Sequence, residues 1–234
     1  MFVPIHDGEP LRHIARPWVT WGLIALNLVI WGAGAAGGLG NLERFDTGLG
    51  VIPAVVIGEA RLEPGLALVP TWATFLTSIF LHGGFLHVAT NMLFLWVLGD
   101  NVEDAMGSAR YLIFYLLCGL AGGAAYVLTA PHAQAPMIGA SGAIAGVIVA
   151  YVMFFPRARI FGLAFNVIPF RIPAWAAIGA WIVIQFIAAL TMPRGEISFW
   201  AHVGGVVAGA ALTPLLRRPG APLGWRRRPP ADIA

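Results

Sequence analysis

The chain has 234 residues, of which 59% are apolar and only 11% are charged, and its mean hydropathy is +0.79. Soluble globular domains carry about 25% charged residues, so this composition excludes that class and predicts a protein that crosses a membrane several times. The formal net charge of +3 comes from arginines in short flanks and turns, which is typical of membrane topology, so we expect no nucleic-acid partner.

Residues 1–16 form a polar lead, and the uncharged segment after it contains the first predicted spanning helix, residues 18–36. No small-residue cleavage site follows a short apolar core, so we interpret this helix as a retained span and not as a signal peptide. Residues 42–70 mix charged side chains with short apolar pieces, which predicts an interfacial loop. Two glycines, Gly83 and Gly84, interrupt the next apolar segment, so the second span is predicted over residues 84–105.

Residues 111–156 contain no charged side chain and are long enough for two helices, the third and fourth spans, with a proline-marked turn between them. The fourth span, residues 141–155, is shorter than about 30 Å of hydrocarbon, because a helix rises about 1.5 Å per residue. Its first residue, Ser141, is therefore expected below the membrane surface, inside the bundle. The fifth and sixth spans are predicted over residues 172–192 and 197–216.

These elements predict an all-α membrane protein, a bundle of six transmembrane helices over residues 17–216 with an interfacial first loop. A basic tail, residues 217–234, is expected to be disordered. The arginines divide unequally between the two sides of this topology. One side, which holds both termini, carries Arg12, Arg16, Arg110, Arg157, Arg159, Arg171, Arg217, Arg218, Arg226, Arg227 and Arg228; the other carries Arg44, Arg61 and Arg194. This imbalance predicts that both termini are cytoplasmic, and the lack of a targeting extension favours a bacterial inner membrane.

Two stretches place one polar side chain among small residues. Gly139-Ala140-Ser141-Gly142 opens the fourth span, and Ala201-His202 lies near the outer end of the sixth span at comparable depth. A serine hydroxyl is a poor nucleophile at neutral pH unless a base lies within hydrogen-bond reach, and a neutral imidazole is the usual base. The topology therefore predicts that Ser141 and His202 come together as a nucleophile and its base.

Glycines at four-residue spacing give both helices a face on which their backbones can approach closely. Gly142 and Gly146 lie on the fourth span, and Gly205 and Gly209 lie on the sixth. His202 is three residues before Gly205, so its imidazole is expected to project from the packed face.

Acyl transfer also requires donors that stabilise an oxyanion. His87 and Asn91 are four residues apart in the second span and therefore point the same way. Buried polar side chains in lipid are costly unless they are partnered or functional. The amide of Ser141, at a helix N-terminus, is a further candidate donor.

In combination, these residues resemble the rhomboid family of intramembrane serine proteases. Gly139-Ala140-Ser141-Gly142 resembles the family's nucleophile motif, and Ala201-His202 followed by two glycines resembles its general-base helix. His82, His87 and Asn91 fall where the family carries its second-helix histidines and asparagine. The resemblance covers residues 17–216 and contains three motifs in the family's order.

The resemblance implies a rhomboid protease domain that cleaves transmembrane protein substrates within or next to their span, in the lipid bilayer, by a Ser141–His202 dyad. His87, Asn91 and the amide of Ser141 would form the oxyanion hole, with no metal or cofactor. The supporting residues would be His82, Gly139, Gly142, Gly146, Gly205 and Gly209. Substrate identity, biological pathway, gating and oligomeric state stay open.

The residues agree with a dyad, because no carboxylate is placed to orient His202. Glu103 and Asp104 are expected to form a structural charge cluster at the cytoplasmic end of the second span. The chain departs from the family pattern where many members carry a Trp-Arg pair, here Ala73-Thr74, and where some carry a tyrosine that stacks on the base, here Ala145. Phe199 or Trp200 could supply the missing ring.

Two other classes of function are alternatives to a protease. A transporter or channel would line a path with intramembrane polar side chains, but the chain shows no intramembrane carboxylate and no repeat between its halves. A non-catalytic, rhomboid-like membrane protein could instead bind client transmembrane helices. A zinc site among the histidines is disfavoured, because no His-Glu-x-x-His motif is present.

Overall fold

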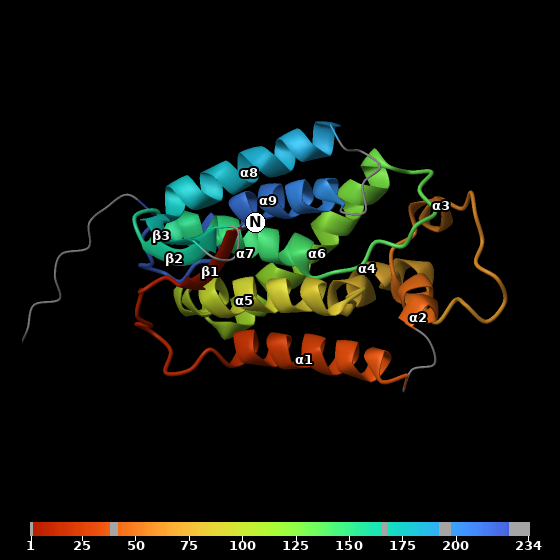
Figure 1. Ribbon diagram of the computed structural model, residues 1–234, viewed down its shortest axis with the longest axis horizontal. Helices are drawn as coiled ribbons and strands as arrows, with labels where there is room; N and C mark the ends of the chain where they lie inside the picture. The colour runs from red at the N-terminus through yellow and green to blue at the C-terminus, as the bar shows by residue number, and fades with distance from the viewer. Residues whose placement is uncertain (1, 38–41, 165–167, 192–197, 225–234) are drawn as a thin grey trace, which may run out of the picture.

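The long apolar segments fold as helices, because a chain in hydrocarbon must satisfy its backbone hydrogen bonds within itself. The computed structural model describes residues 2–37, 42–164, 168–191 and 198–224. Figure 1 shows the long helices side by side along the longest axis, with α1 and α8 on opposite sides. Their bounds are α1 Trp18–Ala35, α5 Phe85–Met106, α6 Ser108–Thr129, α7 Ser141–Phe154, α8 Ala174–Thr191 and α9 Phe199–Leu216.

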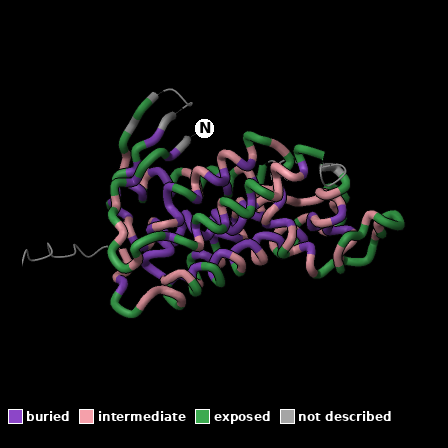
Figure 2. Tube along the Cα trace, turned by 90° about the horizontal axis from the view of Figure 1, so that it is seen from below, coloured by how far each residue is buried: buried purple, intermediate pink, exposed green. Residues whose placement is uncertain are grey.

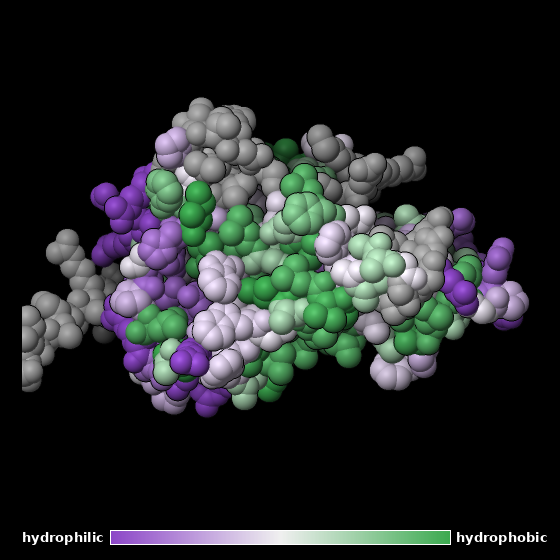
Figure 3. All heavy atoms as spheres, turned by 60° about the horizontal axis from the view of Figure 1, so that its bottom comes forward, coloured by the Kyte–Doolittle hydropathy of each residue, from purple (hydrophilic) through white to green (hydrophobic). Residues whose placement is uncertain are grey.

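Within the described part of the chain, α1, α6, α8 and α9 are long and apolar enough to cross a membrane. The bent pair Thr71–Phe80 and Phe85–Met106, with 78° between its parts, makes a fifth candidate span. On the face that carries α1, hydrophobic side chains gather in the middle and hydrophilic ones towards the ends (Figure 3). The prediction of a helical, multi-pass membrane protein is confirmed. The predicted count of six stays a prediction, because α7 is apolar but, with 14 residues, is shorter than these helices.

Helix α7 lies at the centre of the bundle. Every residue from Gly142 to Tyr151 is buried, and α7 packs against α5, α6, α8 and α9. Figure 2 shows buried positions through the middle of the molecule and exposed positions around it. A helix that is apolar on all sides is expected in such a place, because it has no face to offer to water. The centre of the bundle is thus the helix that begins with Ser141.

The predicted first loop contains short helices. They are α2 Leu42–Leu49, α3 Pro53–Val56, the 3-10 turn η1 Thr71–Ala73, α4 Thr74–Thr77 and the 3-10 turn η2 Ser78–Phe80. The loop is tied to the bundle by an antiparallel bridge between Val51 and Met137, just before the nucleophile motif. Two sequence predictions fall outside the described residues: the tail beyond residue 224, and the loop that carries Arg194.

Two buried carboxylates near the end of α5 serve as caps for other segments. Glu103 is fully buried and accepts hydrogen bonds from the backbone amides of Val19 and Thr20, at 3.2 and 2.8 Å, and so caps the start of α1. Asp104 accepts hydrogen bonds from the backbone amides of residues 12–14, at 3.1, 2.6 and 2.8 Å. These bonds satisfy helix-end and loop amides that would otherwise be unpaired. They give the predicted charge cluster a structural role.

A small antiparallel sheet, which the sequence analysis did not predict, covers the end of the bundle near Tyr151. Its strands are β1 Phe2–His6, β2 Arg159–Ala164 and β3 Ile168–Pro173, in the order β1-β2-β3. Pro4 pairs with Gly162, and Phe161 pairs with Arg171. The lead at residues 1–16 therefore begins with a strand that pairs with the connection between α7 and α8.

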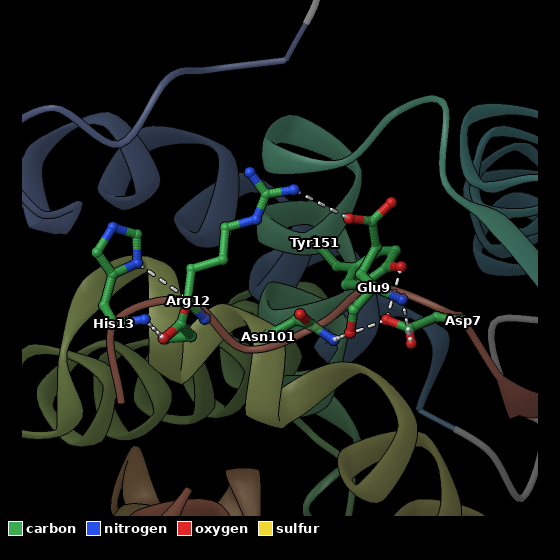
Figure 4. Close-up of polar contacts among 7 residues, drawn as sticks. Asp7, Glu9, Arg12, His13, Asn101 and Tyr151 are labelled. Carbon is green, nitrogen blue, oxygen red and sulfur yellow. Dashed lines mark hydrogen bonds and ion pairs between the residues drawn. The ribbon is translucent and has the colours of Figure 1, made fainter. Parts of the chain in front are cut away.

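Asp7 fastens this strand to the bundle (Figure 4). Its carboxylate is 6% exposed and accepts hydrogen bonds from Asn101 Nδ2 on α5 and from the hydroxyl of Tyr151 on α7, both at 2.8 Å. Burial raises the pKa of Asp7 above its usual value of 3.8, and the hydrogen bond from Tyr151 opposes this shift. Asp7 thus holds the N-terminal segment on the bundle, and its carboxylate binds a proton more readily when this segment is docked.

We expect docking of β1 to depend on pH through Asp7. Because the folded-state pKa lies above the unfolded one, the Asp7 contribution to docking is largest below about pH 4 and falls as the pH rises through the raised pKa. In Asp7→Asn the amide oxygen still accepts from Tyr151, but the side chain has no titratable group. This variant should therefore lose the part of the pH dependence that comes from Asp7. Hydrogen exchange of residues 2–6 from pH 4 to 8, corrected for intrinsic rates, measures it. An equal pH slope in both proteins would contradict the assignment.

Candidate active site

The turn before α7 is shaped by one glycine. Gly139 has φ +126°, a conformation that L side chains rarely adopt, and its amide donates to the carbonyl of Ser78 at 2.9 Å. A Cβ on Gly139 would lie 2.8 Å from Nε2 of His87. The turn therefore requires glycine for its backbone conformation and also for the space that the imidazole of His87 occupies.

Ser141 is the first residue of α7, and Ala140 is its N-cap with φ −70° and ψ −8°. No side chain caps this helix, so the hydroxyl of Ser141 is not used for capping. Amides in the first turn of a helix have no partner within the helix, and they lie at the positive end of its dipole. Ser141 therefore combines a hydroxyl that is not used for capping with an amide that can stabilise a developing negative charge.

Helices α7 and α9 are in backbone contact at their glycines. A Cβ on Gly209 would lie 2.6 Å from Cα and 2.8 Å from the carbonyl oxygen of Gly146. A Cβ on Gly205 would collide with the carbonyl oxygen of Gly142. The glycine faces predicted from the four-residue spacing are thus the faces that meet. Helix α6 joins them, because Gly122 also lies against Gly142.

This contact brings Ser141 and His202 together from positions 61 residues apart. Nε2 of His202 lies 2.9 Å from Oγ of Ser141, which is hydrogen-bond distance. When the proton of the neutral imidazole is on Nδ1, Ser141 donates its hydroxyl hydrogen to Nε2. The pair then has the geometry of a nucleophile and a general base.

His202 has further neighbours that the sequence analysis did not identify. Its Nδ1 lies 2.7 Å from Oε1 of Gln185 on α8. The ring of Trp181, one turn earlier on α8, lies 6.1 Å from the imidazole at 32°, and Phe199 lies 6.2 Å away, edge-on at 88°. Phe199 was one of the two rings considered from the sequence, whereas Trp181 is the more nearly parallel one. The available signal was a glutamine in an otherwise apolar helix, four residues after a tryptophan.

The predicted oxyanion side chains lie one turn apart on α5, and the imidazole of His87 faces the turn before α7. Asn91 is 8% exposed, and its Nδ2 has no hydrogen-bond partner among the described residues. His87 places its Nε2 beside Gly139, as described above. An unpaired buried donor is costly, so the amide of Asn91 is either strained or reserved for a ligand.

His82 lies next to His87. It is 2% exposed, and its ring meets that of His87 edge-on at 5.0 Å. Neither of its ring nitrogens has a hydrogen-bond partner in the described part of the chain. With Trp31 and Asp46 it lines a cavity of about 10 Å³. Its ring contact with His87 is compatible with the predicted supporting role, which stays a prediction. Over the described ranges, no three His, Cys, Asp or Glu side chains come together as a metal site.

The two departures from the family pattern are accommodated by local packing. Ala145 is fully buried and clusters with Val149 and Val206, and Trp181 packs against this cluster. A ring from α8 thus lies near His202 where α7 carries only a methyl group. In the first loop, Thr74 is largely buried and donates its hydroxyl hydrogen to the carbonyl of Thr71 at 2.6 Å, which holds that turn without a Trp-Arg pair.

Comparison with known proteins adds an independent observation. Residues 70–219, which contain Ser141, His202, His87, Asn91 and Gln185, match the family model described as the Rhomboid domain. The chain is 45% identical over 75 residues to rhomboid protease GluP of Bacillus subtilis, which covers 32% of this chain and 14% of that protein. It is 31% identical over 137 residues to rhomboid protein 1, mitochondrial, of Saccharomyces cerevisiae, covering 56% and 38%.

A longer match is to the putative rhomboid protease YdcA of Bacillus subtilis, 26% identical over 197 residues, or 84% of this chain and 80% of that protein. The matches to the first two relatives span less than half of the length of those proteins.

Proposed function

Because this chain belongs to the rhomboid family, we propose that it is an intramembrane serine endopeptidase that cleaves transmembrane proteins within or next to their span. The observation that carries the proposal is the 2.9 Å contact between Ser141 Oγ and His202 Nε2, inside the matched region. Two relatives, GluP and YdcA, are named as proteases or putative proteases, which favours a hydrolase.

The proposed reaction is acyl transfer to serine. His202 accepts the hydroxyl proton of Ser141 through Nε2 while Oγ attacks the carbonyl carbon of the substrate peptide. The carbonyl oxygen becomes an oxyanion, which the amide of Ser141, Nδ2 of Asn91 and Nε2 of His87 stabilise as donors. His202 then gives its proton to the leaving amine, and water activated by the same base hydrolyses the acyl-enzyme.

We place the site below the outer surface of a bacterial inner membrane, with both termini in the cytoplasm and residues 17–216 as the protease domain. In this arrangement α7 is the fourth span, a short one, and it brings the number of spans to six. Its 14 residues rise about 21 Å, less than about 30 Å of hydrocarbon, so Ser141 begins within the membrane. The arginine distribution supports this orientation.

The test is cleavage of a single-span substrate by the purified protein in liposomes, with wild type beside Ser141→Ala. We expect wild type to release two fragments and Ser141→Ala to release none, while both bind the substrate. Mass spectrometry of the fragments locates the cleaved bond relative to the span. Binding without cleavage by wild type, across several substrates, would reject the protease and support a client-binding protein.

Asn91→Ala is expected to lower kcat about 10²-fold to 10³-fold, the usual effect of losing one oxyanion donor, with a smaller effect on KM. The side chain is buried and its Nδ2 has no hydrogen-bond partner in the described ranges, so the amide can bind the oxyanion without breaking another bond seen there. Steady-state cleavage in liposomes measures the change. Thr90→Val is the matched control, because among the residues that the structure describes the Thr90 hydroxyl bonds only within its own helix, to the carbonyl oxygens of Leu86 and His87. Equal kcat for Asn91→Ala and the control would refute the assignment.

A further inference from the structure

Gln185 is a polar side chain turned inward from an apolar helix. Helix α8 contains no charged residue, and its only other polar side chain, apart from the tryptophans, is Thr191 at its end. Val183 and Ile184, beside Gln185 in the chain, are 57% and 60% exposed, whereas Gln185 is 8% exposed. A polar group in a membrane helix is costly unless it is partnered, so its burial requires an explanation.

The partner of Gln185 is the base of the proposed dyad. Oε1 of Gln185 lies 2.7 Å from Nδ1 of His202, and on the other side of the ring Nε2 lies 2.9 Å from Ser141 Oγ. A neutral imidazole has one donor and one acceptor nitrogen. If Nδ1 donates to a carbonyl oxygen, Nε2 must present its lone pair to the serine. The opposite tautomer would leave Nδ1 and Oε1 as two acceptors facing each other.

We propose that Gln185 is a positioning residue that fixes His202 in the tautomer and orientation in which Nε2 accepts the proton of Ser141. This inference rests on the proposed protease function. Gln185 occupies the place of the third member of a catalytic triad, with a neutral amide in place of a carboxylate. The rings of Trp181 and Phe199 contact the imidazole and restrict its rotation, and Gln185 binds its Nδ1.

A neutral partner suits this location. When His202 takes the proton of Ser141 it becomes an imidazolium, and its Nδ1 hydrogen remains bonded to the carbonyl dipole of Gln185. A carboxylate would stabilise the imidazolium more strongly, but a charged side chain within the membrane costs more free energy than a neutral amide. Gln185 therefore orients the base without a buried charge.

Three variants test the proposal in liposomes. Gln185→Met keeps the length and burial of the side chain but removes the acceptor. Gln185→Glu keeps an acceptor oxygen. Val183→Met places the same new side chain at an exposed position of the same helix. Each is measured for kcat, KM, pH dependence, thermal unfolding, and the rate at which a fluorophosphonate labels Ser141, which needs no protein substrate.

For Gln185→Met we expect kcat and the labelling rate to fall about tenfold, equivalent to about 1.4 kcal/mol, with KM and thermal unfolding close to wild type. Gln185→Glu should recover most of the labelling rate. The acidic limb of the pH–rate profile should move to lower pH in Gln185→Met and to higher pH in Gln185→Glu, because the acceptor stabilises the imidazolium. Val183→Met should behave as wild type.

The proposal is overturned if Gln185→Met retains the wild-type rate, or if the Met and Glu variants are equally slow with an unmoved acidic limb, which indicates packing alone. Failure of the premise has a different signature. In that case wild type itself neither cleaves a substrate nor reacts with the fluorophosphonate, and the Gln185 variants cannot differ from it.

Discussion

Ser141→Ala and His202→Ala are each expected to reduce cleavage by about 10³-fold or more, to the background of the assay, and the double variant should lose no more than either single one. Nucleophile and base act as a unit, so removing one leaves the other without a function. The 2.9 Å contact between the two side chains is the structural basis for this non-additivity. The measurement is kcat/KM for a single-span substrate in liposomes, with thermal unfolding to show that each variant folds.

Thr129→Val is a suitable control for the dyad variants. Thr129 is exposed, and within the described part of the chain its hydroxyl bonds only inside α6, to the backbone oxygens of Ala125 and Tyr126. This variant should cleave at the wild-type rate. Residual activity within tenfold of wild type in Ser141→Ala would show that another group attacks the substrate. A double variant much slower than both single variants would show that the two side chains act independently.

After the dyad variants, Gly209→Ala is expected to have the largest effect, and it should lower both stability and activity. Its new methyl group would lie 2.6 Å from Cα and 2.8 Å from the carbonyl oxygen of Gly146, both backbone atoms of α7 that cannot rotate away. Overpacking of this kind costs about 1–3 kcal/mol of unfolding free energy. Relief requires α9 to move away from α7, and a displacement of about 1 Å between His202 and Ser141 can lower the rate about 10²-fold.

The matched control for this prediction is Gly179→Ala on α8, where a Cβ would meet no atom within 4 Å. The same substitution there should leave activity unchanged and raise the free energy of unfolding slightly, because the helix propensity of alanine is more favourable than that of glycine by about 1 kcal/mol. Thermal unfolding and cleavage rates of the two variants are compared in the same lipid. Equal stability of both variants would mean that α7 and α9 are not in backbone contact.

Several features of the site could be predicted because they depend on local sequence. Ser141 follows glycine and alanine at the start of an apolar stretch, and His202 precedes glycines at four-residue spacing. Small residues at that spacing have one main use in a membrane helix, which is close approach to another helix. The juxtaposition of Ser141 and His202 followed from that spacing together with helix lengths.

Gln185 and Trp181 were not identified because nothing in the local sequence indicates which face of α8 turns inward. Helix α8 is apolar nearly all round, so its pattern does not distinguish a lipid-facing side from a buried one. The rotation of α8 is decided by its packing against α7 and α9. Only that rotation brings the amide of Gln185 to Nδ1 of His202.

Properties that add up residue by residue were determined by the sequence, whereas contacts between distant residues were decided by the tertiary structure. Length and hydropathy determined a helical, multi-pass membrane protein, because transfer of apolar residues into lipid is a sum over residues that does not depend on their partners. Pairing of β1 with β2, the capping of α1 by Glu103, and the contact between Gln185 and His202 are decided only in the folded chain. Each joins groups far apart in sequence, and directional hydrogen bonds between such groups exist only once the helices have packed.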